Sequence, residues 1–353
     1  MNPNFSARLR CPRCAGAFDL TVFEGEADVR EGALRCRCGN AYPILGGIPR
    51  VLPDDLMSTL LAEQEDFFDR HPDLRPARPE ARPSATLSTL RAFGDEWKRF
   101  PERHAVHEGI FRWYFEGAGG VAWKGLDALD AGCGMGRWLH FARREGAHAV
   151  GMDVSPALEV AAAREGGDLV QADLRQPPFL PESFDLVFCL GVVHHLEDPL
   201  QGVKALARLV RPGGELRLYV YRSLEDEPWA RRALLGLVTL IRRLTTRLPY
   251  GLVHASAAII AVAATVLFLW PRRLLHRTPW GDRLTRGLPL VQYTNIPFRM
   301  LVAEQFDRLV APIEGRFRRE EVEAWIRAVG FEVVTILAGL GWRVVARRPL
   351  AAP

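Results

Sequence analysis

Four cysteines near the start of the sequence could hold a metal ion. They form two close pairs, Cys11 with Cys14 and Cys36 with Cys38. Four thiolates close a tetrahedral zinc site that leaves no coordination position open, and such a zinc is structural. Close pairs favour metal over disulfides in a reducing compartment. Because residues 1–52 are too few to hold a core unaided, metal binding would supply much of their folding free energy. We therefore predict Zn²⁺ at these four residues.

The second cysteine pair departs from the regular spacing. Its C-x-C pattern replaces C-x-x-C and leaves fewer backbone N–H groups to reach the sulfurs of Cys36 and Cys38. The alternative is a segment that has lost its metal and kept its fold. All four ligand-type residues are present, which favours the metal site.

A glycine turn in the middle of the chain could hold a ligand. Residues 130–136, Asp-Ala-Gly-Cys-Gly-Met-Gly, follow an apolar run and precede a helical pattern, which predicts strand, tight turn and helix. Glycines let the backbone approach a ligand closely, and a helix N-terminus offers unpaired N–H donors. The alternative is a glycine-rich turn without a ligand.

The glycine spacing separates two ligand classes. The dinucleotide fingerprint G-x-G-x-x-G requires a third glycine where this sequence has Arg137, which counts against NAD. The run LDAGCGMG instead resembles the first motif of class I S-adenosylmethionine-dependent methyltransferases, of the methyltransferase type 11-like kind. The resemblance implies that Asp130 closes the first strand. It also implies that the glycine turn cradles the amino-acid half of the cofactor.

Two more acids follow apolar runs. Asp153 comes about twenty residues after the glycine turn, where an acid can accept hydrogen bonds from both ribose hydroxyls. Asp173 closes the next strand. The resemblance implies that Asp173 accepts from the adenine amino group and that Leu174 donates a backbone N–H. Solvated loop acids are a plausible alternative for one such residue, but a poor one for three acids at three strand ends.

Residues 183–196 resemble a later motif of the same family, S-F-D-x-V-x-x-x-x-V-x-H-H-L, and Pro212-Gly213-Gly214 resembles its turn into strand five. These motifs span roughly residues 94–222, and their combination is specific. The expected cofactor-binding set is Asp130, Gly132, Cys133, Gly134, Gly136, Asp153, Val154, Asp173, Leu174 and Leu190.

Strand and helix patterns alternate along the same region, which predicts parallel strands with helices on both faces. A final helix and hairpin follow near the C-terminus. We therefore expect an α/β fold with a doubly wound, seven-stranded, Rossmann-like methyltransferase sheet over residues 93–222 and 320–348. Ligands of such sheets bind outside the carboxyl ends of the strands.

The N-terminal segment is expected to be an accessory unit. Residues 42–49, Tyr-Pro-Ile-Leu-Gly-Gly-Ile-Pro, resemble the end of small zinc ribbons that are fused to, or partner, methyltransferases. Within residues 53–92, the run 71–83 spaces four prolines among charged residues, which predicts an extended linker. The zinc ribbon, residues 1–52, is thus expected to be a separate body.

Residues 223–319 interrupt the sheet between strands five and six and are expected to form a helical lid. Leu252 to Trp270 is a run of nineteen residues without a formal charge, long enough to span a membrane. A single span would leave the last hairpin across the bilayer from the other strands, so we expect a buried lid helix. The alternative is peripheral membrane contact through residues 229–273.

A sulfonium methyl is already activated, so positioning of the acceptor supplies most of the acceleration. A base is needed only for an acceptor that must lose a proton, and His195, His194 and Tyr221 are the candidates. Packing or substrate shaping is an equally good expectation for each. We expect a small-molecule, lipid-linked or saccharide acceptor. The alternatives are an rRNA or tRNA base and a non-catalytic cofactor-binding scaffold.

The composition limits partners and compartment. The 353 residues carry a formal charge of +4, and only three of the 46 basic residues are lysines, which is weak support for nucleic-acid binding. The N-terminus lacks the pattern of a secretory signal. We expect a cytoplasmic protein, with peripheral attachment to the inner membrane face as the alternative; the sequence leaves the oligomeric state open.

Overall fold

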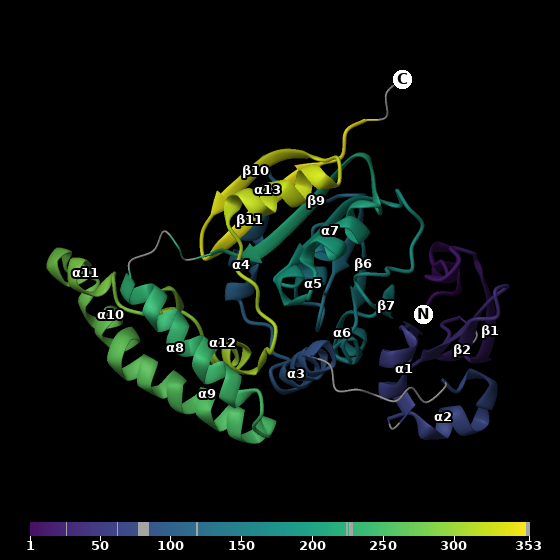
Figure 1. The fold of residues 1–353 in the computed structure, drawn as a ribbon, viewed down its shortest axis with the longest axis horizontal. Helices are drawn as coiled ribbons and strands as arrows, with labels where there is room; N and C mark the ends of the chain where they lie inside the picture. Colours follow the sequence, from purple (N-terminus) through teal and green to yellow (C-terminus); the bar gives the residue numbers. More distant parts are fainter. Residues whose placement is uncertain are drawn as a thin grey trace. The chain divides into compact units, whose positions relative to one another are not determined.

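The computed structural model describes residues 1–353 apart from 26, 62, 77–84, 118, 224, 226–228 and 351–353. The chain forms two compact units (Figure 1). Unit 1 consists of Met1–Gly94, His107–Ser223 and Ile313–Pro353, and unit 2 of Asp95–Val106 and Leu224–Pro312. Unit 1 contains both the predicted zinc ribbon and the predicted Rossmann-like sheet.

The described strands of unit 1 form one sheet of eleven strands in the order β1-β2-β3-β4-β7-β6-β5-β8-β9-β11-β10. Their bounds are β1 Phe18–Glu24, β2 Glu31–Cys36, β3 Ala41–Leu45, β4 Ile48–Val51, β5 Asp127–Ala131, β6 His148–Asp153, β7 Leu169–Ala172, β8 Phe184–Leu190, β9 Val210–Tyr221, β10 Glu332–Ala338 and β11 Gly341–Arg347. The seven strands β5 to β11 are the predicted Rossmann-like sheet, which confirms the fold class.

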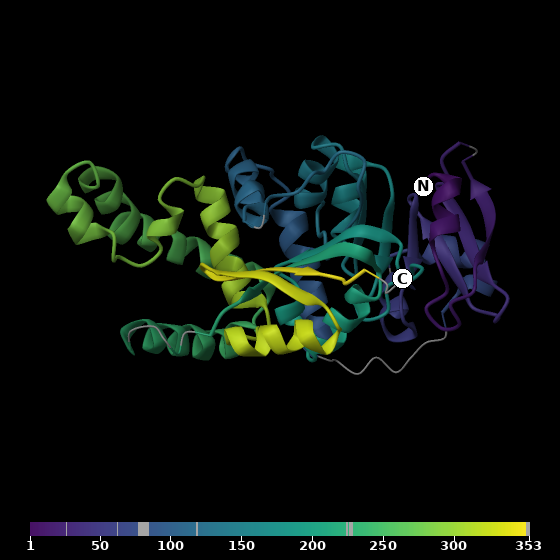
Figure 2. The same cartoon turned by 90° about the horizontal axis from the view of Figure 1, so that it is seen from above.

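Strands β5 to β9 run parallel, and β11 lies antiparallel between β9 and β10. They are near-continuous runs of buried apolar residues, as expected for a sheet covered on both faces. The covering helices include α4 Val106–Phe115, α5 Arg137–Arg144, α6 Leu158–Glu165, α7 Pro199–Ala207 and α13 Arg319–Ala328 (Figure 2). This arrangement brings the carboxyl ends of β5, β6, β7 and β8 to one edge, where ligands of such sheets bind.

The ribbon continues the central sheet. Strand β4 pairs in parallel with β7, Arg50 facing Gln171 and Val51 facing Ala172. Ribbon residues such as Leu34 and Ile44 are fully buried in the same apolar core as Val170 of the central sheet. The structure therefore differs from the expectation of a separate ribbon body, because the free edge of β7 is completed by β4.

Part of the expected linker is helical. Helices α1 Asp54–Leu61 and α2 Glu65–Arg70 follow β4, and a 3₁₀ turn covers Pro72–Leu74. Phe67 and Phe68 of α2 are buried, which explains why these residues pack on the ribbon instead of forming an extended tether. Most of the proline-rich run lies at residues 77–84, outside the described residues; helix α3, Ala85–Arg99, follows it.

Unit 2 is helical in the part of the chain that the structure describes, as expected for the insertion. Its elements are α8 Trp229–Thr245, α9 Tyr250–Ala264, a π-helical turn Thr265–Leu269, α10 Trp270–Leu275, α11 Pro279–Thr285, a 3₁₀ turn Val291–Tyr293 and α12 Phe298–Val310. Residues from Ile313 onward belong to unit 1, so the insertion ends earlier than the expected boundary at 319.

The apolar run of the insertion forms one continuous helix, Tyr250–Leu275. It is the one helix among the described residues that is long and apolar enough to cross a membrane by length and composition. Only 28% of its most apolar stretch is buried inside the protein. The structure therefore differs from the expected buried lid helix, because one face alone of this helix packs on protein.

Candidate functional site

The glycine turn has the conformation that its sequence requires. Gly132 and Gly136 have φ of +85° and +79°, a region that other residues rarely adopt. A Cβ at Gly132 would lie 2.4 Å from a methyl of Val192. The backbone N–H groups of Gly132 and Cys133 both donate to the carbonyl of Met152, which ties the turn to β6. The turn is thus held rigidly at the carboxyl end of β5, directly before α5.

Asp130 is a buried carboxylate that lacks the usual compensation. Its side chain is 1% exposed, and neither oxygen has a partner of hydrogen-bond geometry among the described residues. Burial raises the pKa of this carboxyl well above its ordinary value and the Asp153 carboxylate adds to that rise, while the Leu139 backbone N–H and the Arg143 charge oppose it. A buried anion of this kind fits a bound cationic or N–H-bearing group. The amino end of S-adenosylmethionine is such a group.

Asp153 connects β6 to the glycine turn. Its Oδ2 accepts from the backbone N–H of Gly134 at 2.7 Å, and its Oδ1 accepts from the N–H of Ser155 at 2.8 Å. Burial raises the pKa of the carboxyl while these hydrogen bonds lower it. Each oxygen keeps a second lone pair, so the side chain can still accept from a ligand hydroxyl.

Asp173 lies at the end of β7, as expected, but its carboxylate is already bound within the protein. Arg175 donates to Asp173 from its backbone N–H at 2.8 Å, from Nε at 3.0 Å and from Nη2 at 2.5 Å. Binding of an adenine amino group there requires that Arg175 share this carboxylate. Leu174 and Leu190 are both buried at the same edge of the sheet, 6% and 9% exposed.

Cys133 faces the core behind the turn. Its side chain is buried, and burial raises the pKa of the thiol well above the ordinary value. A Cβ built on Gly151 of β6 would lie 3.0 Å from its sulfur, so the thiol fills space between β6 and the turn. The side chain of Cys133 therefore packs, and only its backbone faces the site.

A chain of hydrogen bonds connects the ribbon to the loop that follows β6 and contains Asp153. Arg50 of β4 is 2% exposed and donates from Nη1 to Oε1 of Gln171 at 2.8 Å. Gln171 donates from Nε2 to the carbonyl oxygen of Val154 at 2.9 Å. Val154 is the residue after Asp153, so this chain fixes the loop that follows β6. Sequence reasoning missed Arg50 and Gln171. The signal that could have found Arg50 is an arginine inside an apolar strand pattern, since such a position is expected to be buried.

His194 and His195 follow β8, as expected. His194 is fully buried, neither ring nitrogen has a partner of hydrogen-bond geometry among the described residues, and burial lowers its pKa well below the ordinary value. Its ring stacks on Tyr221 with centroids 4.0 Å apart. Nδ1 of His195 lies 2.6 Å from the carbonyl oxygen of Ile313. Because a carbonyl only accepts, Nδ1 carries the proton, and Nε2 is the basic nitrogen of neutral His195.

The segment that returns from the insertion passes over these histidines. Gly315 donates its N–H to the carbonyl of His194 at 2.7 Å, and Phe317 donates to that of Tyr221 at 3.0 Å. The Arg316 guanidinium lies over the Tyr221 ring, 5.1 Å from its centroid, and pairs with Glu314 at 2.9 Å. Sequence reasoning placed Glu314 and Arg316 in the insertion and missed both, because no local pattern marks this return segment.

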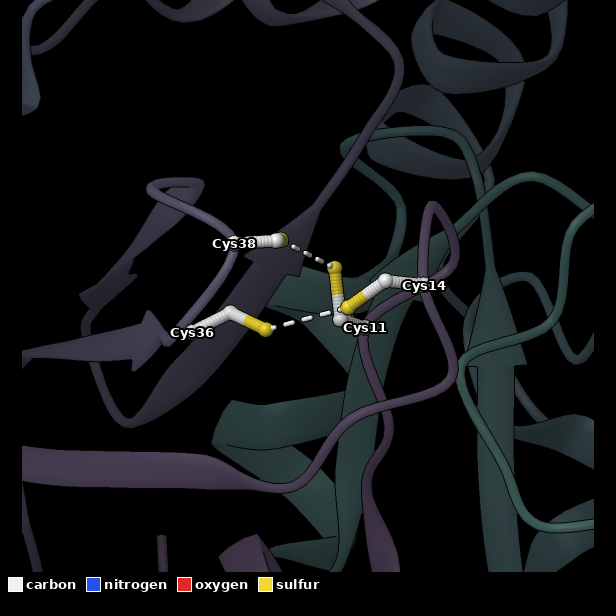
Figure 3. A group of neighbouring side chains, drawn as sticks. All are labelled: Cys11, Cys14, Cys36 and Cys38. Carbon is white, nitrogen blue, oxygen red and sulfur yellow. Dashed lines mark hydrogen bonds between the residues drawn. The ribbon is translucent and has the colours of Figure 1, made fainter.

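The four N-terminal cysteines form one cluster (Figure 3), and their sulfurs all lie within 4.8 Å of one another. Cys11 and Cys38 sulfurs are 3.7 Å apart, and those of Cys14 and Cys36 are 3.3 Å apart. Sulfurs placed tetrahedrally around Zn²⁺ at about 2.3 Å would be roughly 3.8 Å apart, so the donor set fits this metal.

One neighbour of the cluster favours a thiolate. Asn40 donates from Nδ2 to the Cys38 sulfur at 3.0 Å, and this hydrogen bond, with others, lowers the pKa of the Cys38 thiol to about 6. Asn40 therefore supplies the kind of N–H contact that the shortened C-x-C spacing was expected to lose.

Comparison with known proteins agrees with this geometry. Residues 129–218 match the family model described as "Methyltransferase domain". The matched region begins at Leu129 in β5 and ends at Leu218 in β9, so it contains the glycine turn, Asp153, Asp173 and both histidines. The match confirms the family resemblance predicted from the motifs in this part of the chain.

Two curated relatives match a similar region. The mouse "Probable tRNA methyltransferase 9B" is 33% identical over 152 residues, covering 36% of this chain and 33% of that protein. A "Ubiquinone biosynthesis O-methyltransferase" of Pseudomonas aeruginosa is 31% identical over 145 residues, covering 38% of this chain and 61% of that protein. The chain thus spans from a third to three fifths of the length of these relatives.

Among solved structures, the magnesium protoporphyrin IX methyltransferase of Synechocystis PCC 6803 with bound SAM is similar at 14% identity and a TM-score of 0.42. The match covers 76% of this chain and all of that one.

Proposed function

We propose that this protein transfers a methyl group from S-adenosylmethionine to an acceptor molecule. The observation that carries the proposal is the buried carboxyl of Asp130, whose oxygens have no partner of hydrogen-bond geometry among the described residues. It lies beside the glycine turn, inside a region that matches a methyltransferase domain. A buried anion without donors is costly, so evolution keeps one where a ligand supplies the missing partner.

Each residue at a strand end would bind a different part of the cofactor. Asp130, beside the glycine turn, would bind the amino group of its amino-acid end. Asp153 would accept from the ribose hydroxyls, and Asp173 with Leu174 and Leu190 would enclose the adenine. When bound, the cofactor supplies an activated methyl group on a positively charged sulfur.

His195 is the best placed base for an acceptor that must lose a proton. The carbonyl of Ile313 fixes its Nδ1–H and leaves Nε2 as the basic nitrogen. His194 is held neutral by burial and stacks on Tyr221, an arrangement that favours shaping of the site over proton transfer. The return segment holds both histidines, because Gly315 donates to the carbonyl of His194 and the carbonyl of Ile313 accepts from His195.

We favour a small-molecule, lipid-linked or saccharide acceptor. One matched relative is named for ubiquinone biosynthesis and the other for tRNA, so the relatives support two acceptor classes. The scarcity of lysine in the chain favours the first class. A transfer RNA or ribosomal RNA base is the second candidate, favoured by the tRNA-named relative. The third is a scaffold that binds the cofactor without methyl transfer.

We further propose that Cys11, Cys14, Cys36 and Cys38 bind a structural Zn²⁺. The supporting observation is the cluster of four sulfurs within 4.8 Å. Four thiols held this close repel one another when ionised, and a dication removes that repulsion. Elemental analysis of purified protein should give one zinc per chain, and a clearly lower content would contradict the site.

Titration calorimetry with S-adenosylmethionine tests the cofactor site without any acceptor. We expect binding by the intact protein and a loss of about tenfold or more in affinity for Asp153→Ala, since two or more charge-assisted hydrogen bonds disappear. Asp198→Ala, which alters an exposed helix cap away from the glycine turn, is the control. Absence of binding, or unchanged affinity of Asp153→Ala, would overturn the proposal.

Labelling separates the acceptor classes. The protein is incubated with methyl-labelled cofactor and, separately, total RNA, a lipid extract or a polar small-molecule extract. Label in the lipid or small-molecule fraction supports the favoured class, and label in RNA supports the second candidate. Label in neither, by protein that binds the cofactor, supports the scaffold.

A further inference from the structure

Helix α9 packs with its small side chains and exposes its large ones. Its buried face consists of Val253, Ala257, Ala261 and Ala264, which are 0–3% exposed. Helix α12 of the same unit packs along α9, and the rings of Phe306 and His254 face each other across this contact. A helix in the core of a soluble protein has the opposite arrangement, because burial of large aliphatic side chains contributes most to stability.

The other face of this helix forms a continuous apolar stripe. It contains Ile259, Val262, Val266, Leu267, Trp270 and Leu274, which are 47–76% exposed. Five of them, Ile259, Val262, Val266, Trp270 and Leu274, follow one another at spacings of three and four residues, and Leu267 lies next to Val266. These spacings place them on one side of the helix, through the π-helical turn and into α10. Soluble proteins rarely leave a continuous stripe of this kind in water, which marks it as a contact surface.

Positive charge surrounds the stripe. Residues 229–286 contain ten arginines and a single acidic residue, Asp282. That acid is bound to Arg272 at 2.5 Å, so it does not offset the remaining arginines. Among them, Arg243 and Arg247 precede α9, and Arg273 and Arg277 end or follow α10; all four are exposed. The whole chain carries only +4, so its positive charge is concentrated in this segment.

We propose that α9 and α10 lie flat on the surface of an anionic lipid bilayer. The apolar stripe enters the boundary between headgroups and acyl chains, and the flanking arginines contact anionic headgroups. Trp270 and the neighbouring Trp280 of α11 are both exposed, and tryptophan is enriched at this depth of a membrane. This proposal does not depend on the proposed methyl transfer.

The helix lies on the bilayer and does not cross it. A crossing at Tyr250–Leu275 needs a second crossing to return the chain to unit 1, and no other described helix has the required length and composition. The buried face of α9 is also covered by α12, whose Glu304 pairs with Tyr293 at the helix surface. Helix α12 also contains the charged residues Arg299, Asp307 and Arg308, and a helix with this many charges does not enter the hydrocarbon core.

Two other partners for the apolar stripe, RNA and a second copy of this chain, fit it less well than lipid does. RNA would be attracted by the arginines and could stack on Trp270 or Trp280, but it would leave aliphatic side chains such as Ile259 without an apolar partner. A second copy of this chain would bring the same positive charge against itself, which disfavours association through this face. The combination of exposed aliphatic side chains and surrounding arginines matches a leaflet of anionic lipid.

Vesicle flotation of the full chain, without cofactor or acceptor, tests the proposal. We expect the protein to float with vesicles of phosphatidylcholine and phosphatidylglycerol, and to float less with pure phosphatidylcholine or at high salt. Leu267→Gln combined with Leu274→Gln should weaken vesicle binding by at least about tenfold, because two exposed apolar side chains no longer enter the lipid. Leu340→Gln, at a leucine of unit 1 that is 59% exposed, is the matched control and should float like the unchanged protein.

Several results would overturn the proposal. These are failure to float with anionic vesicles, equal flotation of the double variant, and a dimer that dissociates on the double substitution without any vesicle binding. Binding to total tRNA that the leucine substitutions leave unchanged, without vesicle binding, would favour RNA instead. Calorimetry with S-adenosylmethionine on the same samples reports the cofactor site independently of vesicle binding, so failure of one proposal is distinguishable from failure of the other.

Discussion

Nη1 of Arg50 lies 2.8 Å from Oε1 of Gln171, although 121 positions separate the two residues in the sequence. Arg50 belongs to the last strand of the ribbon and Gln171 to the edge strand β7 of the Rossmann-like sheet. Through Gln171 the ribbon reaches the Val154 carbonyl, in the loop that contains Asp153. The ribbon is therefore part of the structure that positions the loop of Asp153 and Val154.

Gln171→Leu should weaken S-adenosylmethionine binding. The substitution places an apolar side chain in β7 and removes both the acceptor of Arg50 and the hydrogen bond that holds the Val154 carbonyl. The latter bond is worth about 0.5–1.5 kcal/mol, or roughly two- to tenfold in Kd. Gln201→Leu, on the exposed surface of α7, is the control for a glutamine change without this contact. Calorimetry checks both, and an unchanged Kd for Gln171→Leu would contradict the positioning role.

Removal of the proposed metal should destabilise the whole of unit 1 and not the ribbon alone. Because β4 pairs with β7, we expect a chelator to lower the melting temperature of unit 1 and to weaken cofactor binding at the same time. Cys14→Ser should do the same, and since Cys14 is exposed, no core cavity explains the loss. Differential scanning calorimetry measures the effect, with chelator saturated by Zn²⁺ beforehand as the control. Loss of metal with unchanged melting and binding would mean that the ribbon is independent.

Asp130→Asn should stabilise the ligand-free protein and weaken cofactor binding. Burial raises the pKa of Asp130 in the folded state, so the folded protein binds a proton more tightly than the unfolded chain does. Stability from this residue is therefore present below the ordinary carboxyl pKa and falls as pH rises toward the raised pKa. At neutral pH the uncharged amide should gain about 1 kcal/mol, visible as a higher melting temperature.

The pH dependence provides the control for this variant. The unchanged protein without cofactor should lose stability as pH rises from mildly acidic to neutral values, and Asp130→Asn should lose less over the same range. Saturating S-adenosylmethionine should reverse the order of the two melting temperatures. Equal pH profiles would show that the Asp130 carboxyl is compensated in the folded protein.

His195→Gln should lower kcat without weakening cofactor binding, once labelling has identified an acceptor that loses a proton. General-base catalysis contributes about 100- to 10,000-fold, and loss of Nε2 should also remove the acidic limb of the pH–rate profile. His194→Phe keeps the stacking on Tyr221 and is expected to retain most of kcat. If both variants lower kcat equally and the pH profile persists, the two histidines shape the site instead.

The sequence by itself predicted the features that depend on local backbone conformation. Gly132 and Gly136 occupy left-handed conformations that other residues adopt at a cost, so their spacing alone predicted the turn. The acids at strand ends and the alternation of strand and helix likewise predicted the seven-stranded sheet and the carboxyl edge where Asp153 and Asp173 lie. The turn and the strand and helix patterns are local, because each depends on residues close in sequence.

Contacts between distant residues were decided by the tertiary structure alone. The pairing of β4 with β7 and the Arg50–Gln171 hydrogen bond depend on which strand edge is free, and no periodicity records that. The return segment with Arg316 reaches Tyr221 for the same reason. The nineteen-residue apolar run, Leu252 to Trp270, predicted a buried lid helix, with membrane contact as the alternative. Only its packing on α12, which takes the alanines and leaves Ile259 and Leu267 exposed, distinguishes the two, because composition does not specify which face of a helix meets protein.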